Sequence, residues 1–143
     1  MNYKERNWLA GFTDGEGCID IYLQQKKRDN KIYYQYVQRV VLANTNKKVI
    51  EYIDNITDHL GYIYCQKKKK PCKSCYIITF GKKRAIKFIK LVYPYLKIKK
   101  RQTKICLDLY KTTSRTKKKL LADILAKRKY LYKQCKKLNK RGI

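Results

Sequence analysis

Acidic residues are scarce in this chain, which has 10 Asp and Glu against 37 Lys and Arg among its 143 residues. The formal net charge at pH 7 is therefore +27. An excess of this size repels itself in a compact state and favours an anionic partner, with nucleic acid as the leading candidate. A cationic surface that only keeps the protein in solution is the simpler alternative.

Long apolar stretches are absent as well. No run of residues is apolar for long enough to cross a bilayer, and residues 1–7 lack the apolar region of a signal peptide. We therefore expect no membrane partner and an intracellular location. Lys, Ile, Asn and Tyr are abundant. Their AT-rich codons suggest an organelle (chloroplast or mitochondrion), a phage or a bacterial cytoplasm as the setting.

The cysteines show no complete metal-binding pattern. Without a secretory signal, a disulfide framework is not expected, and most of the six cysteines are predicted to be small buried residues. Cys72 and Cys75, with Cys65 and His59 upstream, have spacing that could hold zinc, but a second closely spaced pair is missing. Free thiols in a turn are the favoured alternative.

Hydrophobic periodicity predicts a mixed order of helices and strands. In the first strand Ile19, Ile21 and Leu23 alternate with Asp20, Tyr22 and Gln24, which is typical of a half-buried strand. We expect helices over residues 3–14, 49–60, 82–92, 98–111 and 117–138, and strands over 18–25, 33–43, 62–66 and 75–80. Strand pairs that alternate with helices predict the α+β class, with one antiparallel sheet covered on one face by helices.

The stretch LAGFTDGEG, residues 9–17, carries the strongest signal for chemistry. An apolar helical run ends here in three spaced glycines and two carboxylates, Asp14 and Glu16. A helix C-terminus disfavours a carboxylate, so Glu16 suggests a functional role. In so basic a chain, such a pair of acids suggests a metal ion held against a polyanion. Asp14 is expected to bond local backbone instead.

This stretch resembles the signature motif of the LAGLIDADG homing endonucleases. Residues 94–102, PYLKIKKRQ, resemble the family segment that carries a basic residue near the active site. The expected order of elements is similar to the family core over about the first 100 residues. The resemblance implies a curved antiparallel sheet that faces DNA and is backed by helices, with the signature helix at a dimer interface. We expect one domain over residues 1–143, with a core at about 3–111 and a basic helical extension at about 112–143.

The resemblance also implies the site residues. Glu16 matches the metal-binding acid, and the Gly15 carbonyl would be a second ligand for Mg²⁺ or another divalent cation such as Mn²⁺. Lys99 matches the basic residue near the scissile phosphate. Asn44 falls near the polar residue that orients water, although Thr45 is an alternative by one position, and Asn44 also suits a helix N-cap.

A single copy of the signature implies a homodimer. Gly11 and Gly15 lie one turn apart on a helix and would let a second backbone approach closely, and the interface would also include Trp8 and Phe12. The expected activity is metal-dependent, site-specific double-strand cleavage of a long, nearly palindromic DNA target, as in enzymes of introns and inteins. Expected DNA contacts are Tyr22, Gln24, Lys26, Gln38, Arg39, Lys67, Lys68, Lys69, Lys70 and Lys100.

Other functions remain open at this point. Proteins of this type include intron RNA maturases and others that bind DNA without cutting it, so intron RNA is an alternative partner. A basic structural protein of the ribosomal kind would explain the charge but not the pattern of glycines and acids. The lysines of the last expected helix either are solvated or contact phosphates, and the sequence favours neither.

Overall fold

The computed structural model describes residues 1–113 and 122–140. The expected start of the last helix, at residue 117, therefore lies outside the described residues. The elements in chain order are α1 (Tyr3–Glu16), β1 (Gly17–Arg28), β2 (Lys31–Asn44), α2 (Lys47–Ile56), β3 (Tyr62–Gln66), β4 (Cys75–Gly81), α3 (Lys83–Val92), the 3₁₀ turn η1 (Tyr93–Tyr95), α4 (Lys100–Lys111) and α5 (Ala122–Leu138).

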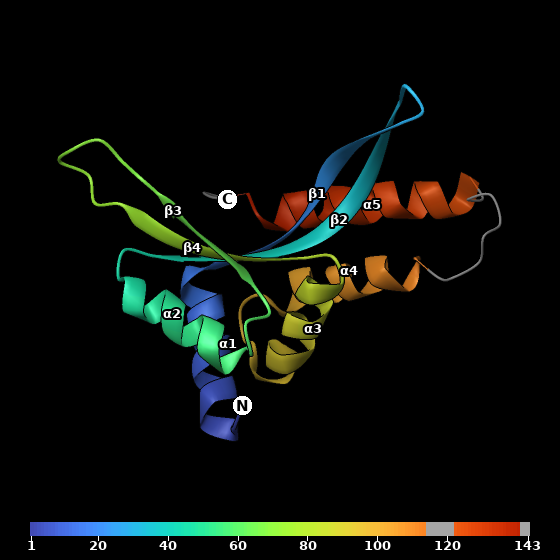
Figure 1. The fold of residues 1–143 in the computed structure, drawn as a ribbon. Coiled ribbons are helices and arrows are strands. Elements are labelled where there is room, and N and C mark those ends of the chain that lie inside the picture. Colours follow the sequence, from blue (N-terminus) through green and yellow to red (C-terminus); the bar gives the residue numbers. More distant parts are fainter. Residues whose placement is uncertain (114–121, 141–143) are drawn as a thin grey trace.

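The four strands form one antiparallel sheet in the order β1-β2-β4-β3. The sheet is strongly curved: its two hairpins, β1–β2 and β3–β4, rise on opposite sides, while α1 to α4 lie beneath it (Figure 1). The predicted α+β class with a helix-backed antiparallel sheet is thus confirmed. None of the described helices is long and apolar enough to span a bilayer.

The two faces of the sheet differ in chemistry because side chains alternate along each strand. Ile19 and Ile21 of β1 point to the helices and are fully buried, as are Val40 and Leu42 of β2. They join Ile78, Phe80 and the apolar sides of the helices in one core. The opposite side, here called the open face, carries Cys18, Asp20, Tyr22, Gln24 and Lys26 of β1 and their neighbours across the ladder.

Helix α1 is held firmly at both ends. At its start, Asn2 and Glu5 form a capping box, with the Asn2 side chain accepting from the Glu5 N–H at 2.9 Å. At its end the chain turns directly into β1 at Gly17, where a Cβ atom would lie 2.6 Å from the Thr13 carbonyl oxygen. Only glycine fits this close approach, and the turn fixes the end of α1 against the sheet.

Three expectations need correction. Helix α2 ends at Ile56 instead of continuing to residue 60, because Asp58 and His59 adopt positive φ angles that end a helix. The apolar spacing of the last helix predicts that Leu125, Leu131 and Cys135 are buried, but Leu125 is 48% exposed, whereas Leu131 and Cys135 are buried as expected. Of the six cysteines only Cys106 and Cys135 are buried, so the prediction that most are buried is wrong.

Candidate active site and nucleic-acid interface

Glu16 is the last residue of α1, and its side chain is exposed. Gly15 precedes it in the final helical turn, whose carbonyl groups have no partners inside the helix. The helix end thus presents a carboxylate and backbone carbonyl oxygens where it meets the sheet. Hard oxygen donors of this kind suit Mg²⁺, which binds few protein carboxylates and retains waters or phosphate oxygens. The residues present therefore fit a divalent cation.

Asp14 points the other way and is only 8% exposed. Its Oδ2 accepts hydrogen bonds from the Lys97 N–H at 2.7 Å and the Ile98 N–H at 3.2 Å, and its Oδ1 accepts from the Lys99 N–H at 2.9 Å. Both oxygens are thus used by backbone that lies 83 to 85 residues later in the chain. The expectation of a structural Asp14 holds, but its partners are distant in sequence rather than local.

Asp14 also determines where Lys99 lies. Lys99 is the N-cap residue of α4, and its backbone is bound by the Asp14 carboxylate. Its ammonium group donates to the backbone carbonyl of Asp14, two residues before Glu16. A positive charge is therefore held at the same helix end as the exposed carboxylate. The two residues matched by the resemblance, one from each motif, are brought together by the fold.

The role of Asp14 can be tested by removing its carboxylate. Replacing Asp14→Ala leaves three backbone N–H groups without their acceptor, so we expect the free energy of unfolding to fall by about 3 kcal/mol. Urea denaturation measures the change. Glu51→Ala is a matched control, because Glu51 pairs with Lys47 only at the surface of α2, and it should change stability by less than about 0.5 kcal/mol. An equal loss in both variants would contradict the role given to Asp14.

Asn44 is engaged in local structure at the end of β2. Its Oδ1 accepts from the Asn46 N–H at 2.8 Å, while Asn46 itself caps α2 through the Lys48 N–H. The neighbouring Thr45 is exposed. The N-cap role thus belongs to Asn46, and the choice between Asn44 and Thr45 as the residue that orients water stays a prediction.

Most of the expected DNA contacts share one side of the sheet. Tyr22, Gln24 and Lys26 alternate along β1 on the open face, and Arg39 lies opposite Asp20 on β2. Gln38 is different: it pairs with the buried Ile21, points to the helix side and is 5% exposed. A shift of one residue along a strand moves a side chain to the other face. The structure therefore does not bring Gln38 to this surface.

The remaining basic residues among the expected DNA contacts come from a loop and a helix start. Lys67, Lys68, Lys69 and Lys70 are all exposed in the loop between β3 and β4, at the tip of that hairpin (Figure 1). Lys100 is exposed at the first position of α4, next to Lys99. Basic groups thus lie both at the tip of one hairpin and near Glu16.

One side of α1 is open around Gly11 and Gly15, while Trp8 at its start packs edge-on against Tyr52 of α2, with ring centroids 5.0 Å apart. A Cβ atom added to Gly11 or Gly15 would meet no atom within 4 Å. Trp8, on the same side, is 40% exposed and stacks on Phe12 with ring centroids 5.4 Å apart. The four residues recur at intervals of three and four, so they form one continuous stripe along the helix.

No zinc site is found in the described parts of the chain. Within them, no three His, Cys, Asp or Glu side chains converge in a way that could hold a metal ion. The His59 Nδ1 instead lies 2.6 Å from the Asp54 Oδ2, and this hydrogen bond raises the pKa of His59. Cys65 and Cys72 are exposed thiols.

The family model described as LAGLIDADG endonuclease matches residues 9–114. The chain belongs to this family. The comparison with curated protein sequences gives no match.

Solved structures with the same fold include several homing endonucleases bound to DNA. I-CvuI in complex with the I-CreI target superposes with a TM-score of 0.74 at 21% identity, covering 98% of this chain and 84% of that one. The archaeal intron-encoded I-Vdi141I complexed with DNA gives a TM-score of 0.74 at 18% identity, covering 98% of this chain and 87% of that one. I-SmaMI bound to cleaved DNA gives 0.69 at 17% identity, covering 92% of this chain but 42% of that one. These likenesses establish the fold.

The sequence-based interpretation missed Asp20 as a partner of Arg39. The two side chains form a bidentate ion pair across β1 and β2, with distances of 3.1 Å and 2.7 Å. This pairing raises the pKa of the Arg39 guanidinium. The opposite charges were visible in the sequence, but the register that places residue 20 against residue 39 was not, because the length of the turn between the strands fixes it.

Proposed function

We propose that this protein is a site-specific DNA endonuclease that acts as a homodimer with a divalent cation. The observation that carries the proposal is the juxtaposition at the end of α1. The last turn of α1 ends in the exposed Glu16 carboxylate, and the Lys99 ammonium bonds to the Asp14 carbonyl two residues earlier in the same turn. Membership of the LAGLIDADG endonuclease family and the fold shared with DNA-bound homing endonucleases support it.

Glu16 and the Gly15 carbonyl would hold the cation. When bound, Mg²⁺ or Mn²⁺ would stabilise charge on the scissile phosphate and activate a water molecule for attack. One chain offers few ligands here, because the only other carboxylate of the motif, Asp14, is bound to backbone. A second copy of the helix end would add a second Glu16, so that each copy serves one DNA strand.

Lys99 would contribute charge at the scissile phosphate. Its ammonium is tethered at the helix end rather than free in solvent, so little motion is needed to stabilise the charge that develops in the transition state. Asn44 or Thr45 would help to orient water near the end of β2. Lys100, exposed at the start of α4, would contact the DNA backbone nearby.

The stripe of Trp8, Gly11, Phe12 and Gly15 is the proposed dimer interface. A two-fold interface needs a self-complementary patch, and a helix side with two glycines permits close backbone contact. The paired copies would place their open faces in line along one duplex. A target of two similar, inverted half-sites follows from that symmetry.

Cleavage of a selected target tests the proposal. Purified protein is incubated with a library of randomised duplexes and Mg²⁺, and molecules with new double-strand ends are sequenced. We expect one long consensus made of two inverted half-sites. Selective duplex binding without any cleavage would support the non-cleaving alternative. Preference for structured RNA over every duplex would support the maturase alternative.

The basic surface makes binding depend strongly on salt. If six to ten phosphates are neutralised, affinity should fall by about 10³- to 10⁵-fold between roughly 50 and 200 mM salt. Lys68→Gln should reduce the slope of log affinity against log salt by about one per subunit. Lys87→Gln is the matched control, since Lys87 is exposed on α3 beneath the sheet. Fluorescence anisotropy with labelled duplex measures the affinity of both variants across the range of salt. A salt-independent affinity would contradict phosphate neutralisation.

A further inference from the structure

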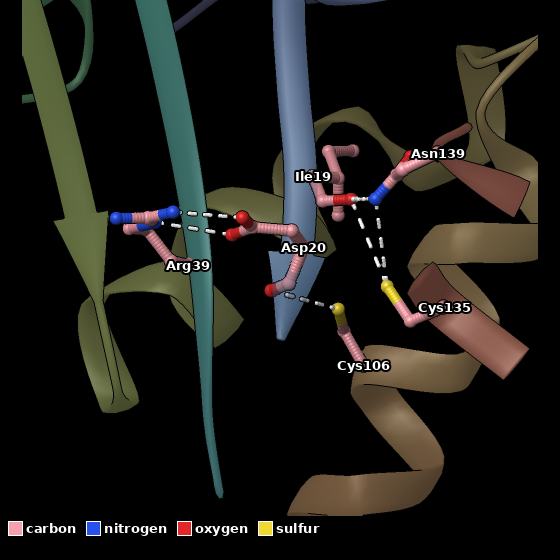
Figure 2. Close-up of polar contacts among 6 residues, drawn as sticks. All are labelled: Ile19, Asp20, Arg39, Cys106, Cys135 and Asn139. Atoms are coloured by element: carbon pink, nitrogen blue, oxygen red, sulfur yellow. Dashed lines mark hydrogen bonds and ion pairs between the residues drawn. The ribbon is translucent and has the colours of Figure 1, made fainter. Parts of the chain in front are cut away.

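The open face contains one tightly built polar cluster, made of Asp20, Tyr22 and Arg39. Asp20 and Arg39 are direct partners in the β1–β2 register. The Arg39 Nε donates to Asp20 Oδ1 at 3.1 Å, and its Nη2 donates to Oδ2 at 2.7 Å (Figure 2). The centre of the guanidinium lies 4.7 Å from the centroid of the Tyr22 ring. Two neighbours thus restrain the guanidinium before any ligand arrives.

The strand beneath this cluster is itself anchored. The Asn139 side chain donates to the Ile19 carbonyl at 2.9 Å, and the buried Cys106 thiol contacts the Asp20 carbonyl (Figure 2). Helix α4 and Asn139, which directly follows α5, therefore hold the segment of β1 that carries Asp20. A contact presented from such a rigid element keeps its geometry when a ligand binds.

The charges of the cluster argue against a phosphate contact. Asp20 cancels the charge of Arg39, and a carboxylate close to a phosphate would repel it. The chain has 37 basic residues with which to contact phosphates and only ten acids. An acid that faces DNA beside an arginine therefore weakens backbone binding at that point. Its effect is to orient the arginine.

The orientation leaves one edge of the guanidinium free. Asp20 uses Nε and one side of Nη2, and among the described residues no partner of Nη1 is found. The Arg39 side chain is 39% exposed, whereas that of Asp20 is 13% exposed. The Nη1–Nη2 edge can therefore donate two parallel hydrogen bonds outward. In the major groove, guanine presents the matching pair of acceptors, O6 and N7.

We propose that Arg39, positioned by Asp20 and Tyr22, reads a guanine in the major groove of each half-site. The assignment rests on the proposed DNA-binding function. Asp20 lies four residues after Glu16, the last residue of α1, so the two are at most about 13 Å apart at the usual rise of a strand. At 3.4 Å per base pair, the guanine lies within about four base pairs of the cleaved bond.

The test uses a variant that keeps the total charge. Asp20→Asn combined with Arg39→Gln removes one negative and one positive charge, so no unpaired carboxylate remains. Duplexes are selected by binding from a randomised library in Ca²⁺, without any need for cleavage. We expect the wild type to select guanine at one symmetric pair of positions. The double variant should lose about 10- to 100-fold in preference there and keep the same salt dependence.

Single variants separate the contributions. Asp20→Asn frees the charge of Arg39, so binding to non-specific duplex should tighten and its salt slope should steepen by about one per subunit, while the guanine preference weakens. Arg39→Lys keeps the charge but cannot bind the base through two parallel bonds, so it should lose the preference alone. Lys68→Gln is the control, which should weaken all sequences equally. Thermal unfolding confirms that each variant is folded.

Several results would overturn the assignment. A double variant with an unchanged preference for guanine, whether or not its melting temperature falls, would make the ion pair purely structural. Uniform loss of affinity with a shallower salt slope would make Arg39 a phosphate contact. A wild type that selects a site with this guanine but never cleaves would overturn the proposed nuclease activity and leave the assignment intact. A wild type that selects no duplex sequence would overturn both.

Discussion

Replacing Glu16→Gln should abolish DNA cleavage while leaving the protein folded and able to bind its target. We expect the cleavage rate with Mg²⁺ to fall by at least about 10³-fold, because the loss of an anionic ligand removes several kcal/mol of metal-assisted stabilisation. Single-turnover cleavage of a plasmid that carries the selected site measures the rate. Glu16→Asp keeps the charge and should retain measurable activity.

The structure explains why this substitution separates catalysis from stability. Glu16 is exposed, and a carboxylate at a helix C-terminus is disfavoured by the helix dipole. Its removal should therefore leave the free energy of unfolding unchanged or slightly higher. It also removes a negative charge that, in the proposed complex, would face the DNA, so binding without metal should not weaken. A residue whose loss costs activity but no stability serves function.

Glu51→Gln is the matched control for this experiment. Glu51 is also an exposed helical glutamate, and it pairs with Lys47 at 2.9 Å on the surface of α2. It should cleave at the wild-type rate. If Glu16→Gln also cleaves at the wild-type rate, Glu16 is not a metal ligand. If it loses target binding together with cleavage, the effect is not specific to the metal site.

Much of this site could be predicted from the sequence because it depends on local pattern. The residues of the signature motif share one helix, so their spacing alone places Gly11 and Gly15 on one side and Glu16 at the end. The alternation of β1 likewise separates Asp20 and Tyr22 from Ile19 and Ile21. Both patterns follow from the repeats of a helix and a strand.

What escaped prediction depends on contacts between distant segments. Gln38 was expected on the DNA side, but the register with β1 places it opposite Ile21, on the side of the core. The three backbone partners of Asp14 lie more than 80 residues away, which no local pattern reveals. The Asp20–Arg39 pair depends on the same register. The sequence shows which side chains of a strand share one face of the sheet. The pairing of one strand with another is set by turns and packing.

Substitution of Gly11 distinguishes a dimer from a monomer, because a larger side chain here should stabilise an isolated chain but disrupt a dimer. Within one chain a Cβ at this position meets no atom, and glycine inside a helix is less stable than alanine by about 0.5–1 kcal/mol. Gly11→Ala should therefore stabilise an isolated monomer. If a second copy of α1 packs closely on this stripe, the same methyl group must displace the partner's backbone.

Gly11→Leu should enlarge the clash with the partner's backbone and dissociate the dimer. Each copy introduces an overpacked side chain, and overpacking costs about 1–3 kcal/mol, counted twice across a two-fold axis. We expect the dimer dissociation constant to rise by at least about 100-fold and the cleavage rate at low protein concentration to fall in parallel. Analytical ultracentrifugation measures the mass. The fluorescence of Trp8, the single tryptophan, reports its exposure on this stripe.

Gly81→Ala provides the comparison that makes the dimer test decisive. A Cβ at Gly81 also meets no atom within 4 Å, but this residue ends β4 and lies away from the stripe on α1. It should leave the oligomeric state unchanged. A Gly11→Leu protein that remains dimeric would mean that the chains pair elsewhere. In that case the two Glu16 carboxylates would not meet at one scissile site, and the proposed division of two strands between two copies would fail.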